Sequence, residues 1–121
     1  PMKKTIFILI LISLFSCNSK SGNCSDLPPS FSSYNDAISS VESVDFKIED
    51  EADTSKSSWI RSADFYSCDG ESGYLIISTD DHEYIHENLP VSVWEDFKNA
   101  DSFGKFYNAN IKNNYQMISK K

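Results

Sequence analysis

The sequence predicts an α+β fold: a small antiparallel meander sheet of three to four strands, packed by two C-terminal amphipathic helices, with one further helix near the N-terminus. Two patterns predict it. Closely spaced strand-like segments with short turns fill residues 59–86, and such segments pair as a meander. Two apolar stripes with helical spacing follow within residues 89–111. At 121 residues the chain has the length of one domain, so we expect sheet and helices to pack together as layers.

Residues 1–16 have the pattern of a secretory signal peptide. Lys3 and Lys4 stand before an unbroken apolar run, residues 6–12, and a basic segment followed by an apolar one directs export. The run is too short for a permanent membrane helix, which needs ~20 apolar residues. A buried core strand is the alternative interpretation, but such strands do not usually follow paired lysines at a chain start.

Residues 14–17, Leu-Phe-Ser-Cys, resemble the lipobox of bacterial lipoproteins. There, a leucine three places upstream and a small residue directly before the cysteine position it for diacylglycerol transfer and cleavage. Phe15 departs from the small or aliphatic residue usual at its place. The resemblance implies a mature chain that starts at Cys17 and carries several acyl chains, palmitate among them. Such a chain is anchored in the inner or outer membrane of the bacterial cell envelope, with its domain outside the cytoplasm.

The cysteine count supports the same compartment. Three cysteines are not an even disulfide set, but Cys24 and Cys68 remain as a pair once Cys17 carries lipid. Disulfides persist outside the cytoplasm, and a bridge that closes about 44 residues contributes roughly 3–4 kcal/mol to stability. Two free thiols are the alternative, since spacing alone does not give pairing geometry.

The net charge argues against nucleic acid as a partner. The formal charge of the chain is −7, and loss of Lys3 and Lys4 with the signal takes it to −9. Nucleic-acid binding depends on lysine and arginine clustered against phosphates. We therefore expect the partner of this acidic domain to be something other than a nucleic acid.

The segment after Cys17 is expected to be a flexible tether over residues 17–32, because small, polar and proline residues dominate it. A helix is expected next, since Ser33 is a candidate N-cap with Asp36 three residues later. The apolar positions of this helix fall on one stripe: Tyr34, Ala37, Ile38, Val41 and Val44. The sequence therefore places the first ordered element at residue 33.

A strand and an acidic loop are expected to complete the N-terminal segment, residues 33–56. Apolar and charged residues alternate over residues 44–48, which predicts a half-buried strand. The acidic run 49–53 predicts a solvated loop. Calcium binding is the alternative for this run, but it lacks the glycine-punctuated ligand spacing of known calcium loops.

Residues 57–117 are the dense part of the chain and are expected to form the main domain. Strands are predicted at residues 59–66, 74–77 and 82–86, separated by polar turns. A helix is predicted to open at Leu89-Pro90, since proline is tolerated in a first turn. A second, shorter helix places its apolar residues on a common side within residues 103–111.

Residues 57–115 resemble the KTSC domain, a short bacterial module also found at the C-terminus of some lysyl-tRNA synthetases. The resemblance rests on the order of several short motifs: Ser57-Ser58-Trp59-Ile60, Tyr84-Ile85-His86 running into Leu89-Pro90, Ala100-Asp101-Ser102-Phe103-Gly104, and Phe106-Tyr107-Asn108. His86 replaces the second tyrosine of the family's Tyr-x-Tyr motif, and Asp81 replaces a turn glycine. The family has no established activity, and the resemblance implies at most RNA binding, which has been suggested for it.

Five residues are candidates for ligand binding: Tyr84, His86, Lys105, Asn108 and Lys112. Residues 102–121 carry lysines and no acid, interleaved with aromatic residues and asparagines, the composition of a surface for anions or single strands. A core-facing helix with solvated lysines is the alternative. On the strand, Tyr84 is expected to pack, whereas His86 is expected to present its polar ring at the surface.

Neither catalysis nor metal binding is indicated. His82 and His86 would lie ~13 Å apart on a strand, too far to share one ion. No serine sits in a nucleophile-elbow motif. We therefore expect a non-catalytic, membrane-anchored lipoprotein with a KTSC-like interaction module, no cofactor, and an envelope protein or glycan as partner. The alternatives are an RNA-binding domain and a small envelope hydrolase or glycan-binding protein.

Overall fold

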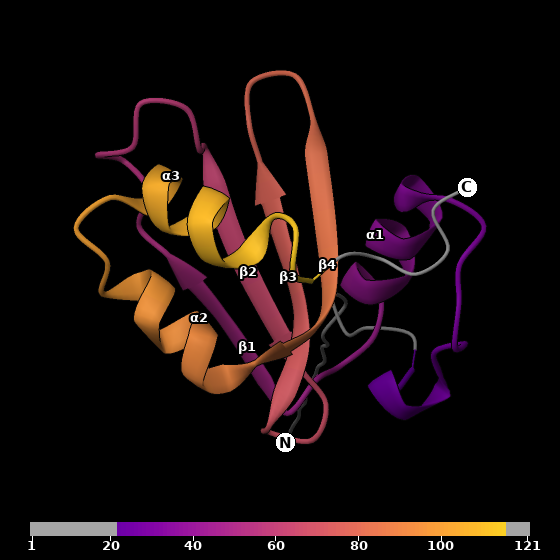
Figure 1. Cartoon of the computed structure of the whole chain (residues 1–121). Coiled ribbons are helices and arrows are strands. Elements are labelled where there is room, and N and C mark those ends of the chain that lie inside the picture. Colours follow the sequence, from indigo (N-terminus) through magenta and orange to yellow (C-terminus); the bar gives the residue numbers. More distant parts are fainter. Residues whose placement is uncertain (1–21, 116–121) are drawn as a thin grey trace, which may run out of the picture.

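The computed structural model describes residues 22–115 (Figure 1). Four antiparallel strands form one sheet in the order β1-β2-β3-β4: β1 (Ile48–Ala52), β2 (Ser62–Ser67), β3 (Ser72–Ser78) and β4 (Glu83–Pro90). The helical elements are η1 (Cys24–Asp26), α1 (Tyr34–Glu42), α2 (Val91–Lys98), α3 (Phe103–Phe106) and the π-helical turn η2 (Tyr107–Ile111). The predicted α+β fold with a meander sheet is confirmed. Residues 1–16 and Cys17, the predicted signal and lipid site, lie outside the described residues.

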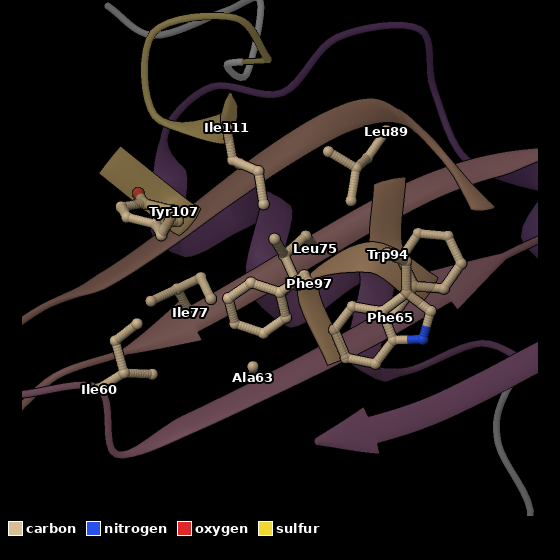
Figure 2. Packing of buried hydrophobic residues seen from close by; sticks show 10 residues of the cluster. All are labelled: Ile60, Ala63, Phe65, Leu75, Ile77, Leu89, Trp94, Phe97, Tyr107 and Ile111. Atoms are coloured by element: carbon tan, nitrogen blue, oxygen red, sulfur yellow. The ribbon is translucent and has the colours of Figure 1, made fainter. Parts of the chain in front are cut away.

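The sheet is buried on both faces by different parts of the chain. One face packs under α2, α3 and η2, and Figure 2 shows ten residues of this cluster, with Phe65 stacked on Trp94. The other face packs against α1 and the segment before it. The buried residues on that face are Phe31, Ala37, Ile38, Val41, Ile76 and Ile85. Since side chains alternate along a strand, β3 sends Leu75 and Ile77 to the first cluster and Ile76 to the second.

A bulge in β4 lets that strand place apolar side chains in both clusters. The register with β3 shifts between Gly73 and Leu75, so β4 has one extra residue there, and Asn88 has a positive φ of 59°. Asparagine is among the few non-glycine residues that adopt this left-handed conformation readily. Without the extra residue, Leu89 would face the same side as Ile85. With it, Leu89 is buried beside Trp94 and Phe97 in the first cluster.

The predicted helix at Ser33 is confirmed in detail. The Ser33 side chain accepts a hydrogen bond from the Asp36 backbone N–H, and the Asp36 carboxylate accepts from the Ser32 backbone N–H. This is a capping box whose returning bond reaches one residue further back than usual. The cap holds α1 so that Ala37, Ile38 and Val41 face the sheet.

The acidic run expected as a solvated loop is instead a strand, and this prediction was wrong. Residues 48–52 form the edge strand β1, which pairs with β2 from Ile48↔Ser67 to Ala52↔Ala63. Asp50 lies on the α2 side of β1, where it accepts hydrogen bonds from Trp94 Nε1 (2.9 Å) and Lys98 Nζ (2.6 Å). These bonds, with that of Lys98 first, hold the pKa of Asp50 below its usual value. The predicted strand at residues 44–48 begins four residues later, because pairing with β2 fixes its position.

The prediction of a flexible tether over residues 17–32 was wrong for residues 22–32. Cys24 forms a disulfide with Cys68, with 5.7 Å between their Cα atoms. Cys24 also donates its backbone N–H to Asp45, and Phe31 is buried at 5% exposure in the second cluster. Residues 22–32 are therefore part of the fold.

The remaining boundaries differ by a few residues. Strand β2 begins three residues later than predicted, and β3 is longer than its predicted segment at both ends. Strand β4 begins one residue later than predicted and continues to Pro90, so Leu89 and Pro90 end the strand rather than opening the helix, and α2 begins at Val91. The Pro90 ring lacks an N–H, and its φ of −63° suits the N-cap position that it occupies. The stripe predicted for this helix is confirmed at Trp94 and Phe97, both buried.

We predict that Asp50→Ala lowers the free energy of unfolding by about 1–2 kcal/mol, since it removes the acceptor of the buried Trp94 indole N–H. Glu51→Ala removes the same charge from the exposed side of β1 and is the matched control, with an expected effect within about 0.5 kcal/mol. Urea unfolding of the full chain at neutral pH measures both. Equal effects of the two substitutions would contradict the role of Asp50.

Candidate ligand-binding cleft

The described residues line an open-sided cavity of about 740 Å³ at one end of the sheet. One wall is the loop after β1, residues 53–59, and the other is the segment 100–108, which connects α2 to α3 and continues into α3 and η2. Its size lies within the range of roughly 300–1,000 Å³ typical of small-molecule sites. We refer to this cavity as the cleft.

The first wall is shaped by hydrogen bonds within its own loop. Ser57 Oγ accepts from the backbone N–H groups of Trp59 (3.3 Å) and Ile60 (3.0 Å). The Ser57 N–H in turn donates to the Thr54 carbonyl. Asp53 accepts from the Ser55 backbone N–H, and this bond lowers the pKa of the Asp53 carboxyl. The serine-rich loop therefore has a defined path that leads to the buried Ile60.

The second wall meets the first at Trp59. Ser102 caps α3 by accepting from the Lys105 backbone N–H. Gly104 lies directly beneath the Trp59 indole, since a Cβ on Gly104 would stand 2.3 Å from Trp59 Nε1. Trp59 also contacts the Tyr107 ring edge-to-face, with 5.8 Å between ring centroids. Glycine at 104 therefore permits the close approach that joins the two walls.

The cleft contains two cations and two carboxylates. Lys56 and Asp53 come from the first wall, and Lys105 and Asp101 from the second; all four are exposed. Within the part of the chain that the structure describes, neither lysine has a carboxylate within ion-pair distance. Lys98 and Arg61, by contrast, pair with Asp50 and Asp80. Lys56 attracts the Asp53 carboxylate from beyond ion-pair distance and helps to lower the pKa of that carboxyl. Both ammonium groups are exposed to solvent at the cleft.

The structure brings two of the five predicted binding residues together. Lys105 and Asn108 line the cleft. Lys112 is exposed at the end of η2 and is not among the residues that line it, and neither are Tyr84 and His86. Tyr84 is half-buried, as expected, and stacks on the His82 ring with 5.8 Å between centroids.

His86 is buried at 3% exposure, so the prediction that it lies at the surface was wrong. Its Nδ1 contacts the Tyr115 carbonyl oxygen, and its Nε2 lies 2.8 Å from the Tyr107 hydroxyl. Because a carbonyl only accepts, Nδ1 carries the proton and donates it to Tyr115, and Nε2 accepts from Tyr107. Burial lowers the pKa of His86, although the bond to Tyr115 acts in the opposite direction. The two contacts of His86 therefore connect β4 to η2 and to Tyr115. Because its ring is buried, a ligand cannot reach it.

The search for candidate residues in the sequence missed Lys56, Trp59 and Asp101. Lys56 is a single cation in a run of serines, which carries no signal by itself. Trp59 and Asp101 stand in two of the short motifs quoted for the family resemblance. The convergence of those two motifs at one cleft is the signal that could have identified them. Among residues 22–115 no group of three histidine, cysteine or acidic side chains is arranged to hold a metal ion.

Comparison with known families matches the part of the chain that forms most of the cleft. The family model of the KTSC domain matches residues 56–115. Neither the curated proteins nor the solved structures contain a match to the chain. The matched residues include β2, β3, β4 and the helices that cover their first face, together with Lys56, Trp59 and the whole second wall of the cleft.

We predict that the protein loses stability as the pH falls below about 6.5, the usual pKa of an unfolded histidine. The folded state lowers the pKa of His86, so the unfolded chain takes up the proton first and becomes favoured. The contribution is present in full above pH 6.5 and declines towards the lowered pKa, by up to about 1.4 kcal/mol per pH unit. Urea unfolding at pH 8, 7, 6 and 5 measures it. The variant His86→Gln should flatten the slope and the exposed His82→Gln should not; identical slopes in all three proteins would refute this account.

Proposed function

Since residues 56–115 belong to the KTSC domain family, we propose that they are the ligand-binding module of a non-catalytic lipoprotein, anchored in a membrane of the bacterial cell envelope through acylated Cys17. The ligand binds in the cleft between residues 53–59 and 100–108. The observation that carries this proposal is the arrangement of the disulfide and the cleft at opposite ends of the sheet.

The disulfide supports a location outside the cytoplasm. Cys24 and Cys68 are bridged, and such bridges are rare where thiols are kept reduced. The third cysteine of the chain is Cys17, which stands at the end of the lipobox-like segment. Between residues 22 and 115, no helix combines the length and the apolar character needed to cross a bilayer. Acyl chains on Cys17 would supply the attachment.

The anchor is close to the fold. Four residues, 18–21, separate Cys17 from Gly22, whose carbonyl accepts the Asp45 backbone N–H. Five Cα–Cα steps reach at most about 18 Å. The end of the sheet that carries the Cys24–Cys68 bridge is therefore held near the lipid headgroups.

The cleft lies at the other end of the sheet. In the pairing of β1 with β2, Ile48 is opposite Ser67, next to Cys68, whereas Ala52 is opposite Ala63 and leads into residues 53–59. Figure 1 shows the β2–β3 turn at the bottom of the sheet and the β1–β2 loop with the start of α3 at the top. A domain attached at its disulfide end would present the cleft away from the membrane, towards a partner in the envelope.

We predict that the full chain incorporates radioactive palmitate in bacterial cells and that Cys17→Ser abolishes the label. The double variant Cys24→Ser/Cys68→Ser, which keeps Cys17, is the control and should be labelled like the wild type. Equal label in wild type and Cys17→Ser would reject the anchor.

We also predict that Cys24 and Cys68 resist a maleimide reagent in intact cells until a reductant is added, because the bridge leaves no thiol. Replacing both by serine should lower the free energy of unfolding by roughly 3–4 kcal/mol. Reaction of both thiols in unreduced cells would place the domain in a reducing compartment and reject the proposed location.

A further inference from the structure

Two exposed cations line the cleft from opposite walls. The chain is acidic, with 11 basic and 18 acidic residues. Lys56 on the first wall and Lys105 on the second nevertheless have no ion-pair partner within the described residues. Because both lysines line the same cleft, an acidic group on a ligand finds a cationic partner on either wall, so at least one such group is expected on the ligand.

The two carboxylates limit how much negative charge the ligand can carry. Asp53 and Asp101 balance the two lysines, so the formal charge of the cleft is zero. A polyanion such as RNA needs several cations along its path to replace its counterions. A ligand with a single carboxylate among uncharged polar groups adds far less negative charge to this cleft than a polyanion does, and its one acidic group can pair with a lysine.

The other groups of the cleft suit hydroxyls and amides. Within residues 22–115, the side chains of Ser58, Asn108 and Asp101 make no hydrogen bond of their own, and they offer both donors and acceptors. Trp59 and Phe103 are half-buried and add apolar surface beside these polar groups. Sugar rings present this combination, with C–H groups on a face and hydroxyls or acetamido groups at the edge.

We infer that the cleft binds a glycan that carries one carboxylate per repeating unit, with the carboxylate between Lys56 and Lys105 and the sugar ring against Trp59. The inference rests on the proposed function, because it names the ligand of that same cleft. The volume of about 740 Å³ admits a ligand of a few sugar rings rather than a folded partner.

The test compares three probes by isothermal titration calorimetry on the full chain in detergent. The disaccharide of N-acetylglucosamine and N-acetylmuramic acid carries one carboxylate, diacetylchitobiose has the same rings without it, and oligouridylate is the polyanion. We expect the first to bind, the second to bind about tenfold more weakly, and the third not to bind. Tighter binding of oligouridylate, or equal binding of the two disaccharides, would overturn the inference.

Variants locate the binding. Lys56→Ala and Lys105→Ala should each weaken the acidic disaccharide about tenfold and leave diacetylchitobiose unchanged. Lys112→Ala makes the same charge change just after η2, outside the cleft, and should stay within twofold. An equal loss in Lys112→Ala would overturn the site. If no sugar binds up to millimolar concentration while Cys17 is still labelled by palmitate, the glycan inference fails and the lipid anchor stands.

Discussion

The whole structure depends on the burial of β3 on both of its faces. Leu75, Ile76 and Ile77 are consecutive and all buried, so the strand requires a cover on each side of the sheet. The helices that follow β4 cover one side. The other side is covered by α1 and by the chain before it, which lie outside the region that matches the family. Residues 22–55 are therefore more than a spacer, because they bury Ile76 and Ile85 and add β1 to the sheet.

Local patterns in the sequence predicted the elements that depend on neighbours in the chain. The Ser33 cap, the stripe of α1, and the stripe of α2 around Trp94 and Phe97 all arise within one or two helical turns. The prediction of a loop for the acidic run was wrong because the structure of this run depends on partners that are distant in the sequence. Asp50 is held by Trp94 and Lys98, 44 and 48 residues later in the chain. The density of charge in a segment does not reveal that one of its carboxylates has hydrogen-bond donors elsewhere in the fold.

The same distinction explains the site. Lys105 and Asn108 were predicted from the composition of one segment, and both line the cleft. Lys56 and Trp59 were missed because they meet that segment only after the sheet has folded. His86 was misplaced because its hydrogen-bond partners, Tyr107 and Tyr115, lie 21 and 29 residues further on. A polar ring is expected at the surface unless both of its nitrogens find partners in the core.

The position of the disulfide also decides how the domain bears mechanical load. Covalent closure between Cys24 and Cys68 makes residues 25–67 a loop that cannot be stretched by pulling on the chain before Cys24. Tension from that side passes straight to Cys68 and into β3, and it bypasses α1, β1 and the first wall of the cleft. Tension between the chain before Cys24 and the chain after Cys68 therefore passes through the bridge, and it does not extend residues 25–67 or the loop that shapes half of the cleft.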